Sequence, residues 1–394
     1  MISTLALVAL AAAPTGAQEI VESAAPRDPD LTLAGEPRVR IGALDGPLDG
    51  PLEYIFGDVT AAIRLDDGSI VVVDEQSHNV RRYDANGRHL WTSGREGDGP
   101  GEYRGLRLLR NCPGAAVTVF DRVQDRITQL DLDGNVVDTR TPNSIGVNPY
   151  GTPACSTDGR LVFTPWPEDR PSVLERAVGE QWRWRVSLRV AGTGSMTVLQ
   201  SGIPGAERTR ISRGSVMPSY WGRSMVFAAV DTGVWFGTSD DYELQHLDWT
   251  GRVTRTARWA GPDLVVTDEQ VERYRDYLSG LDRYADGEGR RRFEREVWPE
   301  RRAYLPERFP AYESLLALAD GGLWIRTHRW RAPGEVLHLL DRDGVWLRRL
   351  TMPGGSVLLD AGPDWVLVRQ RDAFDVPTVA LYELVETDRE EIPG

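Results

Sequence analysis

The chain has 394 residues, a formal net charge of −13 at pH 7 and a sequence pI near 5.0. Nucleic acids and anionic membranes require basic patches, so this acidic balance predicts neither as a partner. All 46 of its Lys and Arg residues are arginine, which excludes a Schiff-base lysine and a Walker A lysine.

The N-terminus has the pattern of an export signal. Residues 2–13 form an apolar run, and the small residues that follow it suit signal-peptidase cleavage after Ala17. The run is too short to cross a bilayer, and no later segment is long enough, so no transmembrane segment is predicted. We expect residues 1–17 to be a signal peptide and residues 18–36, rich in Glu, Pro and Asp, to be a flexible leader. The protein would then be periplasmic or extracellular.

Residues 64–103 predict a small antiparallel sheet. The turn dipeptides Asp67-Gly68 and Asn86-Gly87 separate segments rich in β-branched and aromatic residues. These strand-like segments are 70–73, 80–83 and 89–92.

Related units recur along the chain, each with a first hairpin turn followed by an apolar strand. The six turns are Asp67-Gly68, Pro113-Gly114, Asp158-Gly159, Thr232-Gly233, Asp320-Gly321 and Gly362-Pro363. Sheets too thin to bury both faces are stable when they stack around an axis. The sequence therefore predicts an all-β fold, a six-bladed β-propeller over residues 37–394.

The first unit ends in a Gly-rich segment that carries a family resemblance. It reads Gly94, Gly97, Gly99, Pro100, Gly101, Glu102 and Tyr103. Residues 64–103 resemble one NHL-type repeat, and the chain is similar to exported bacterial six-bladed β-propeller proteins. Many proteins of that group have no assigned activity, so the resemblance implies architecture and little chemistry.

Two features concern how the ring closes and where it is interrupted. The last unit is one strand short, and residues 38–41 form an isolated strand, so we expect the N-terminal strand to complete the last blade. Residues 201–219 predict a flexible loop. Residues 263–309 predict a helical insertion between blades four and five, beginning with a capping box of Thr267 and Gln270.

The chain has two cysteines, Cys112 and Cys155, in consecutive units. In an oxidising compartment they predict a disulfide between neighbouring blades, with two free thiols as the alternative.

Aromatic residues beside prolines recur in the loops that lead into the blades. These are Tyr54, Tyr103, Tyr150, Tyr220 with Trp221, and Tyr312. Such loops gather at one mouth of a propeller, where tyrosine suits a ligand-binding rim. Alternatively, the rings pack between adjacent blades.

The loops between second and third strands should open on the same mouth and carry polar side chains. From these loops we select His78, Arg122, Trp166, Asp240, His328 and Arg371 as candidate ligand-binding residues. The alternative is that they are simply solvated.

The helical insertion is rich in arginine and would cover this mouth as a lid. Its ten arginines favour an anionic ligand or an acidic partner, unless its own glutamates pair with them on a solvated helix face.

No residue pattern defines a catalytic mechanism. The five histidines lack metal-ligand spacing, and no GxSxG elbow is present. The leading hypothesis is a monomeric, exported binding or interaction module without a cofactor, recognising a peptide, a glycan or a small anion. The alternative is a calcium-dependent esterase or lactonase-like enzyme, with Asp58 and Glu313 near the channel.

Overall fold

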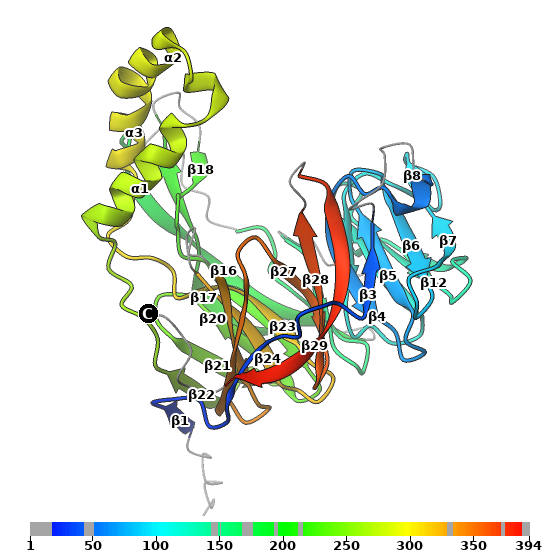
Figure 1. Cartoon of the computed structure of the whole chain (residues 1–394). Helices are drawn as coiled ribbons and strands as arrows, with labels where there is room; N and C mark the ends of the chain where they lie inside the picture. The colour runs from blue at the N-terminus through cyan, green and yellow to red at the C-terminus, as the bar shows by residue number, and fades with distance from the viewer. Residues whose placement is uncertain are drawn as a thin grey trace, which may run out of the picture.

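The computed structural model describes residues 18–42, 51–142, 149, 151–167, 176–192, 196–211, 216–328, 334–371 and 375–387. Strands predominate and follow one another in consecutive antiparallel sets, with a group of helices between β22 and β23 (Figure 1). The predicted signal peptide, residues 1–17, lies outside the described residues.

The first three sets come from the first half of the chain. The first set comprises β4 (Val59–Arg64), β5 (Ile70–Asp74), β6 (Asn79–Tyr83) and β7 (His89–Ser93). The second comprises β10 (Leu106–Leu109), β11 (Val117–Asp121), β12 (Arg126–Leu130) and β13 (Val136–Arg140). The third comprises β14 (Ala154–Cys155), β15 (Leu161–Phe163), β16 (Gln181–Ala191), β17 (Met196–Arg210) and β18 (Val216–Pro218). A short ribbon of β8 (Arg95–Glu96) and β9 (Glu102–Tyr103) links the first two sets.

The remaining sets come from the second half. The fourth comprises β19 (Val226–Val230), β20 (Gly233–Gly237), β21 (Glu243–Asp248) and β22 (Val253–Trp259). The fifth comprises β23 (Tyr312–Ala317), β24 (Leu323–Thr327), β25 (Gly334–Leu340) and β26 (Trp346–Pro353). The sixth comprises β27 (Val357–Ala361), β28 (Trp365–Arg371) and β29 (Pro377–Thr387).

The hairpin between third and fourth strands repeats one hydrogen-bonding pattern in the first, second, fourth and fifth sets. An aspartate accepts backbone N–H groups two and four residues ahead, at 2.8–3.0 Å. The glycine three residues ahead has φ of 81–86°, which residues with a Cβ rarely adopt. The four turns are Asp84–Gly87, Asp131–Gly134, Asp248–Gly251 and Asp341–Gly344. These turns fix the register of the outer strands.

The hydrophobic core is divided into layers, each lying between two consecutive sets. One further layer joins the sixth set to the first, where Leu367 and Val379 pack with Val59 and Tyr83. The sets therefore form a closed ring, in which the sixth set packs against the first. The first strands contact one another on the inside, β4 with β10 and β27, and β19 with β14 and β23.

The N-terminal segment adds strands to three sets. β1 (Glu19–Ser23) pairs in parallel with β22, and β2 (Asp30–Leu33) lies between β26 and β29. β3 (Val39–Ile41) pairs with β29, where the N-terminal strand was expected. The prediction of a flexible leader over residues 18–36 is wrong, because free edges of the fourth, fifth and sixth sets supply backbone partners for this stretch.

The third set contains a long hairpin, β16–β17, which reaches towards the helices (Figure 1). The expected loop over residues 201–219 is wrong in its first half, because residues 200–209 pair with residues 181–188. Backbone pairing outweighs the Gly- and Ser-rich composition that suggested a loop.

The helical segment comprises α1 (Asp268–Ser279), a 3₁₀ turn (Asp282–Tyr284), α2 (Gly287–Arg292), a π-helical turn (Phe293–Val297) and α3 (Trp298–Ala303). α1 starts with the predicted capping box of Thr267 and Gln270. The segment has its own core, which includes Tyr274, Phe293 and Trp298. No helix in the described part of the chain is long and apolar enough to cross a membrane.

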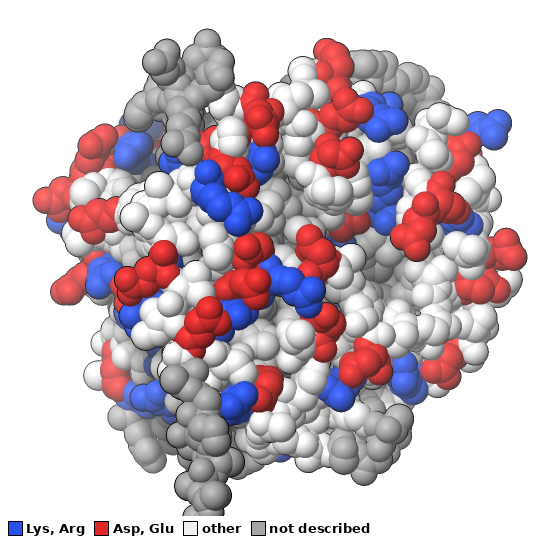
Figure 2. Space-filling model, turned by 90° about the horizontal axis from the view of Figure 1, so that it is seen from below, with Lys and Arg blue, Asp and Glu red and all other residues white. Residues whose placement is uncertain are grey.

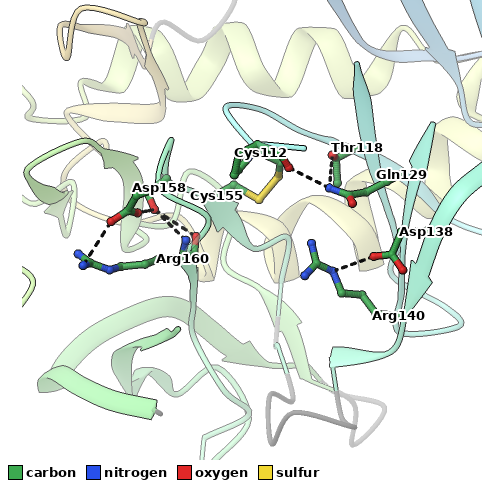
Figure 3. The surroundings of a disulfide bond; sticks show 10 residues. Cys112, Thr118, Gln129, Asp138, Arg140, Cys155, Asp158 and Arg160 are labelled. Atoms are coloured by element: carbon green, nitrogen blue, oxygen red, sulfur yellow. Dashed lines mark hydrogen bonds and ion pairs between the residues drawn. A yellow bond between two sulfur atoms is a disulfide. The ribbon is translucent and has the colours of Figure 1, made fainter. Parts of the chain in front are cut away.

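Cys112 and Cys155 form the predicted disulfide, with their Cα atoms 5.0 Å apart. It joins the loop after β10 to β14, and so links the second and third sets (Figure 3). Beside it, the Gln129 side-chain amide donates to the carbonyl oxygen of Pro113 at 3.1 Å.

We expect loss of this disulfide to lower the free energy of unfolding by about 2–4 kcal/mol, because it closes a loop of 43 residues in the unfolded chain. Urea unfolding of the protein and of a C112S/C155S variant measures the difference. Alkylation without reduction, followed by mass spectrometry, should label no cysteine; two labelled thiols would contradict the bond.

Candidate functional site

The first strands surround two cavities that follow one another along the inside of the ring. The channel pocket, about 550 Å³, is lined by β10, β14, β19 and β23. The far pocket, about 670 Å³, is lined also by β4 and β27, and shares Arg110, Asn111 and Ala317 with the channel pocket. Together they form a channel enclosed by the first strands.

A third cavity, the mouth pocket of about 570 Å³, shares Glu313 with the channel pocket. It collects side chains from the loop before β19, the loop after β20 and both ends of the β23–β24 hairpin. Four of the residues that the sequence suggested line it: Tyr220, Trp221, Tyr312 and His328. These residues are far apart in the sequence, and the fold brings them to one place.

His328 and Glu313 form a hydrogen-bonded pair at this pocket. The Nδ1 atom of His328 lies 2.7 Å from Oε1 of Glu313, and the His328 side chain is only 9% exposed. Burial opposes ionisation of Glu313, but the hydrogen bond from His328 and the charge of Arg326 outweigh it and lower the pKa of this carboxyl. Glu313 is therefore an ionised acceptor that orients the imidazole.

Arg326, from the second strand of the fifth set, contacts Glu313 of this pair, while Arg369 and Arg371, from that of the sixth set, pair with Asp58; none of the three lines the channel pocket or the mouth pocket. Arg326 is 3.4 Å from Glu313 and 3.2 Å from Glu335, while Arg369 and Arg371 are 3.6 and 3.7 Å from Asp58. The pKa of Arg369 lies below its usual value, because burial penalises the charged guanidinium and because Arg371 adds positive charge nearby. The surroundings of Arg369 are thus deficient in negative charge.

Two more ion-pair networks involve the loops between second and third strands, at Glu75 of the first set and Asp240 of the fourth. Glu75 pairs with Arg107 at 2.5 Å and with Arg122 at 3.1 Å, and its backbone N–H donates to the carbonyl oxygen of Asp58 at 2.9 Å. This places Glu75 next to the Asp58 group. Both interactions with arginine lower the pKa of Glu75 against the opposing effect of burial.

The second network involves Asp240, after β20. Asp240 pairs with Arg183 of β16 at 2.8 Å and with Arg223 at 3.0 Å, and Arg223 also pairs with Glu207 of β17. Burial raises the pKa of Asp240, but the hydrogen bond from Thr238 and the charge of Arg183 lower it overall. The network anchors the long β16–β17 hairpin to the fourth set.

The helical segment packs on the mouth through aromatic rings. Tyr220 stacks on Tyr274 of α1 at 4.5 Å, and Trp221 contacts Phe309 at 4.7 Å. The ends of the segment are tied together, since the N–H of Phe309 donates to Leu264 and that of Val266 donates to Glu307.

Four of the ten arginines of the helical segment pair with its own acids. Their partners are all glutamates of the same segment, at 2.9–4.0 Å. These pairs are Arg273–Glu269, Arg275–Glu272, Arg275–Glu294, Arg292–Glu296 and Arg302–Glu272. This is the arrangement of a solvated helix face, the alternative that the sequence left open.

Tyr54, Tyr103 and Tyr312 lie in packing positions, although Tyr312 also borders the mouth pocket. Tyr103 and Tyr312 are 0% and 1% exposed, and the hydroxyl of Tyr312 donates to the carbonyl oxygen of Glu243. The ring of Tyr54 contacts Tyr83 at 5.7 Å. Tyr150 lies outside the described residues. For the three described tyrosines, the location matches packing between sets better than a free rim.

The remaining predicted residues are dispersed. Arg122 and Arg371 belong to the ion-pair networks above, whereas Trp166 is 40% exposed and lies outside the lining of the mouth pocket. His78 occupies a turn with φ of 51°.

Sequence reasoning missed Arg326 and Arg369. Each directly follows the apolar first part of a second strand, in Leu323–Thr327 and Trp365–Arg371. That charge at the end of an apolar run is the signal that could have found them.

Among the described residues, no three His, Cys, Asp or Glu side chains lie together in a way that could hold a metal ion. The calcium alternative therefore gains no set of ligands from this part of the chain. Asp58 and Glu313 are instead engaged with arginines.

At the end of the channel away from the mouth pocket, an ion pair connects two sets at the far pocket. Arg110 donates to Asp360 at 2.7 Å, which joins the second set to the sixth at the wall of the far pocket. On the face turned away from the helices, acidic and basic side chains lie in small mixed groups (Figure 2).

No family model matches the chain, and no curated protein matches it. Similar solved structures include a protein of Bacteroides fragilis whose name marks it as exported, with 12% identity and a TM-score of 0.48, covering 94% of this chain and 100% of that one. A member of the DUF4221 family from Bacteroides vulgatus has 10% identity and a TM-score of 0.44, covering 92% and 100%. Virginiamycin B lyase from Staphylococcus aureus has 11% identity and a TM-score of 0.37, covering 88% and 87%. Similarity of this degree assigns no function to the chain.

Proposed function

We propose that the protein is an exported six-bladed β-propeller that binds a small anionic ligand at the mouth of its channel. The six sets of strands would be the blades, with β3 completing the last and the helical segment lying beside the mouth. The core layers between consecutive sets, including the one between the last and the first, support this arrangement.

The proposal of an anionic ligand rests on the surroundings of Arg369, which leave its positive charge poorly compensated. Its guanidinium donates to the carbonyl oxygen of Val59 at 2.8 Å, yet its carboxylate partner among the described residues, Asp58, is 3.6 Å away and is shared with Arg371. A partly buried guanidinium with a lowered pKa is stabilised by an added negative charge. Carboxylate and phosphate groups suit this role because they accept paired hydrogen bonds from arginine.

The cavities limit the size of the ligand. The channel pocket and the mouth pocket, of about 550 and 570 Å³, fall within the range of small-molecule sites. A short acidic peptide, a short acidic glycan or a small organic anion fits this range, and a large folded partner does not. The disulfide is consistent with an oxidising compartment outside the cytoplasm.

The test compares two arginines of nearly equal exposure, Arg369 at 23% and Arg255 at 22% of the side chain. Citrate, a galacturonate trimer, a tri-glutamate peptide and neutral galactose trimer are screened by thermal shift, and hits are measured by calorimetry. We expect an anionic compound to stabilise the wild type, and Arg369→Gln to weaken its binding about 10- to 100-fold through the loss of a charge-assisted hydrogen bond.

The matched control is Arg255→Gln, on β22 and outside the lining of both pockets, which should bind the same compound as the wild type does. Equal binding by Arg369→Gln and the wild type, or no stabilisation by any anion of the panel, would contradict the proposed function.

A further inference from the structure

The imidazole of His328 uses only one of its two nitrogens for hydrogen bonding among the described residues. Its Nδ1 bonds to Glu313, but Nε2 is buried and no described residue offers it a hydrogen-bond partner. Because the ionised carboxylate fixes the proton on Nδ1, Nε2 carries the free lone pair. A carboxylate-oriented imidazole with an unused lone pair at a pocket has the arrangement of a general base.

The Nδ1 atoms of His78 and His338 are also buried without a hydrogen-bond partner among the described residues, but His89, His246 and His338 lack a carboxylate partner there. His246 is satisfied on both nitrogens by Thr232 and Thr254, and burial lowers its pKa to about 4. His338 packs on Trp346 at 4.6 Å, and burial lowers its pKa to about 3. His89 bonds to Thr92 at 2.8 Å. None of these three lines the mouth pocket.

The hydroxyl groups of the pocket show which nucleophile the base could activate. Ser219 bonds to Thr209 at 2.7 Å, Ser224 bonds to the Met225 carbonyl oxygen at 3.3 Å, and Ser239 bonds to the Ser224 carbonyl oxygen at 3.0 Å. Among the described residues, no hydrogen bond joins a serine to His328. Water is therefore the nucleophile that the geometry favours.

We propose that His328 is the catalytic base of a metal-independent hydrolysis of carboxylic esters or lactones in the mouth pocket, with Glu313 as its positioning residue. Nε2 takes a proton from a water molecule while the water oxygen bonds to the carbonyl carbon. The resulting tetrahedral intermediate breaks its bond to the alkoxy oxygen, and the departing alkoxide takes the proton from His328. The products are a carboxylic acid and an alcohol, and no oxidant or further reactant is needed.

Phe309 controls access to the base. Its ring lies 5.1 Å from the imidazole of His328 and is itself 7% exposed, held against Trp221 at 4.7 Å. Phe309 ends the helical segment, whose two ends are tied together at Leu264. Movement of this end of the segment would uncover Nε2.

The test measures hydrolysis of p-nitrophenyl acetate and of a lactone panel by the full-length protein, in the presence of a chelator, as a function of pH. We expect His328→Gln to lower the rate on the order of 100-fold, which is typical for loss of a general base. Glu313→Gln should lower it less and change the pH profile, because the imidazole loses its fixed tautomer. The control His89→Gln should keep the rate of the wild type.

A second measurement does not depend on turnover. Diethyl pyrocarbonate acylates neutral imidazole nitrogens, and peptide mass spectrometry identifies the modified histidine. We expect Phe309→Leu to increase modification of His328 several-fold, and His246 and His338 to stay unmodified. Wild-type protein without esterase or lactonase activity, a His328→Gln variant with full activity, or unchanged modification in Phe309→Leu would each overturn the proposal. Since p-nitrophenyl acetate carries no anionic group, its hydrolysis tests the role of His328 even if the Arg369 binding test fails.

Discussion

Removal of residues 18–42 should destabilise the protein more than any other change considered, by about 5 kcal/mol or more. β2 and β3 bury Leu31 and Ile41 to 6% and 1% exposure, and full burial of each such side chain contributes about 1.5–3 kcal/mol. Asp30, 3% exposed, also pairs with Arg349 at 2.6 Å. Without these strands, the edges of β26 and β29 would be bare and open to pairing between molecules.

The position of β3 adds to this effect. The hairpin glycine Gly87 of the first set lies against it, since a Cβ there would come within 3.0 Å of Val39. Ile41 belongs to the core layer between the sixth and first sets. β3 is therefore part of the closure of the ring and not only an added edge strand.

The measurement is chemical and thermal unfolding of residues 18–394, 24–394 and 43–394. The form 24–394 is the control, because β1 contributes backbone pairing with β22 and exposed ion pairs but no buried apolar side chain. If 43–394 fails to fold, the single substitution Ile41→Ala provides a second measurement, with an expected loss of about 2–5 kcal/mol. Equal stability of 43–394 and 18–394 would contradict a closing role for these strands.

The strands of the repeating sets could be predicted because their signals are local. Turn pairs such as Asn86-Gly87 and Asp343-Gly344 determine the chain reversal through glycine at positive φ, whatever the rest of the protein does. β1 and β2 could not be predicted in this way. Their sequences are polar and short, and they become strands only because sets from distant parts of the chain offer them an edge.

The candidate site, too, could be predicted only where its residues have local sequence signals. His328 could be selected from its place after a second strand, but its partner Glu313 and the neighbour Arg369 depend on register and on the contact between sets. The tyrosine pattern was visible in the sequence, yet whether a ring binds or packs depends on the neighbouring set. At Tyr103 the structure shows why: a Cβ on Gly94 would lie 2.6 Å from its ring, so the loop closes tightly over it.

Asp74, at the end of β5, should be the most sensitive single carboxylate of the first set. It is fully buried, accepts the N–H groups of Gly57 and Asp58 at 3.0 and 2.9 Å, and lies 3.5 Å from Arg81. Ser77 donates to it as well. Asp74→Ala would leave these donors and a buried guanidinium without their acceptor, so we expect a loss of about 3 kcal/mol of unfolding free energy. Asp74→Asn, which keeps one acceptor oxygen, should lose about 2 kcal/mol.

The effect should depend on pH in a defined direction. Burial raises the pKa of Asp74, but the backbone donors, Ser77 and Arg81 outweigh it, so the pKa in the folded protein is below that of the unfolded chain. The unfolded state then binds the proton first, and the contribution of Asp74 is fully present above the unfolded pKa of about 3.9 and is lost as the pH falls through the folded pKa. The difference in stability between the wild type and Asp74→Asn should therefore be constant near neutral pH and shrink in acid.

Urea unfolding between pH 7 and pH 3 measures this difference. The matched control is Asp133→Asn, an exposed aspartate in the outer hairpin of the second set, which should change the unfolding free energy by less than about 0.5 kcal/mol at every pH. A difference for Asp74→Asn that grows towards acid would show that the carboxylate is not held in its charged form. The donors at Gly57 and Asp58 lie directly before β4, so loss of Asp74 should also disturb the first strand next to Arg369, and anion binding should weaken in Asp74→Asn although its side chain does not line the mouth pocket.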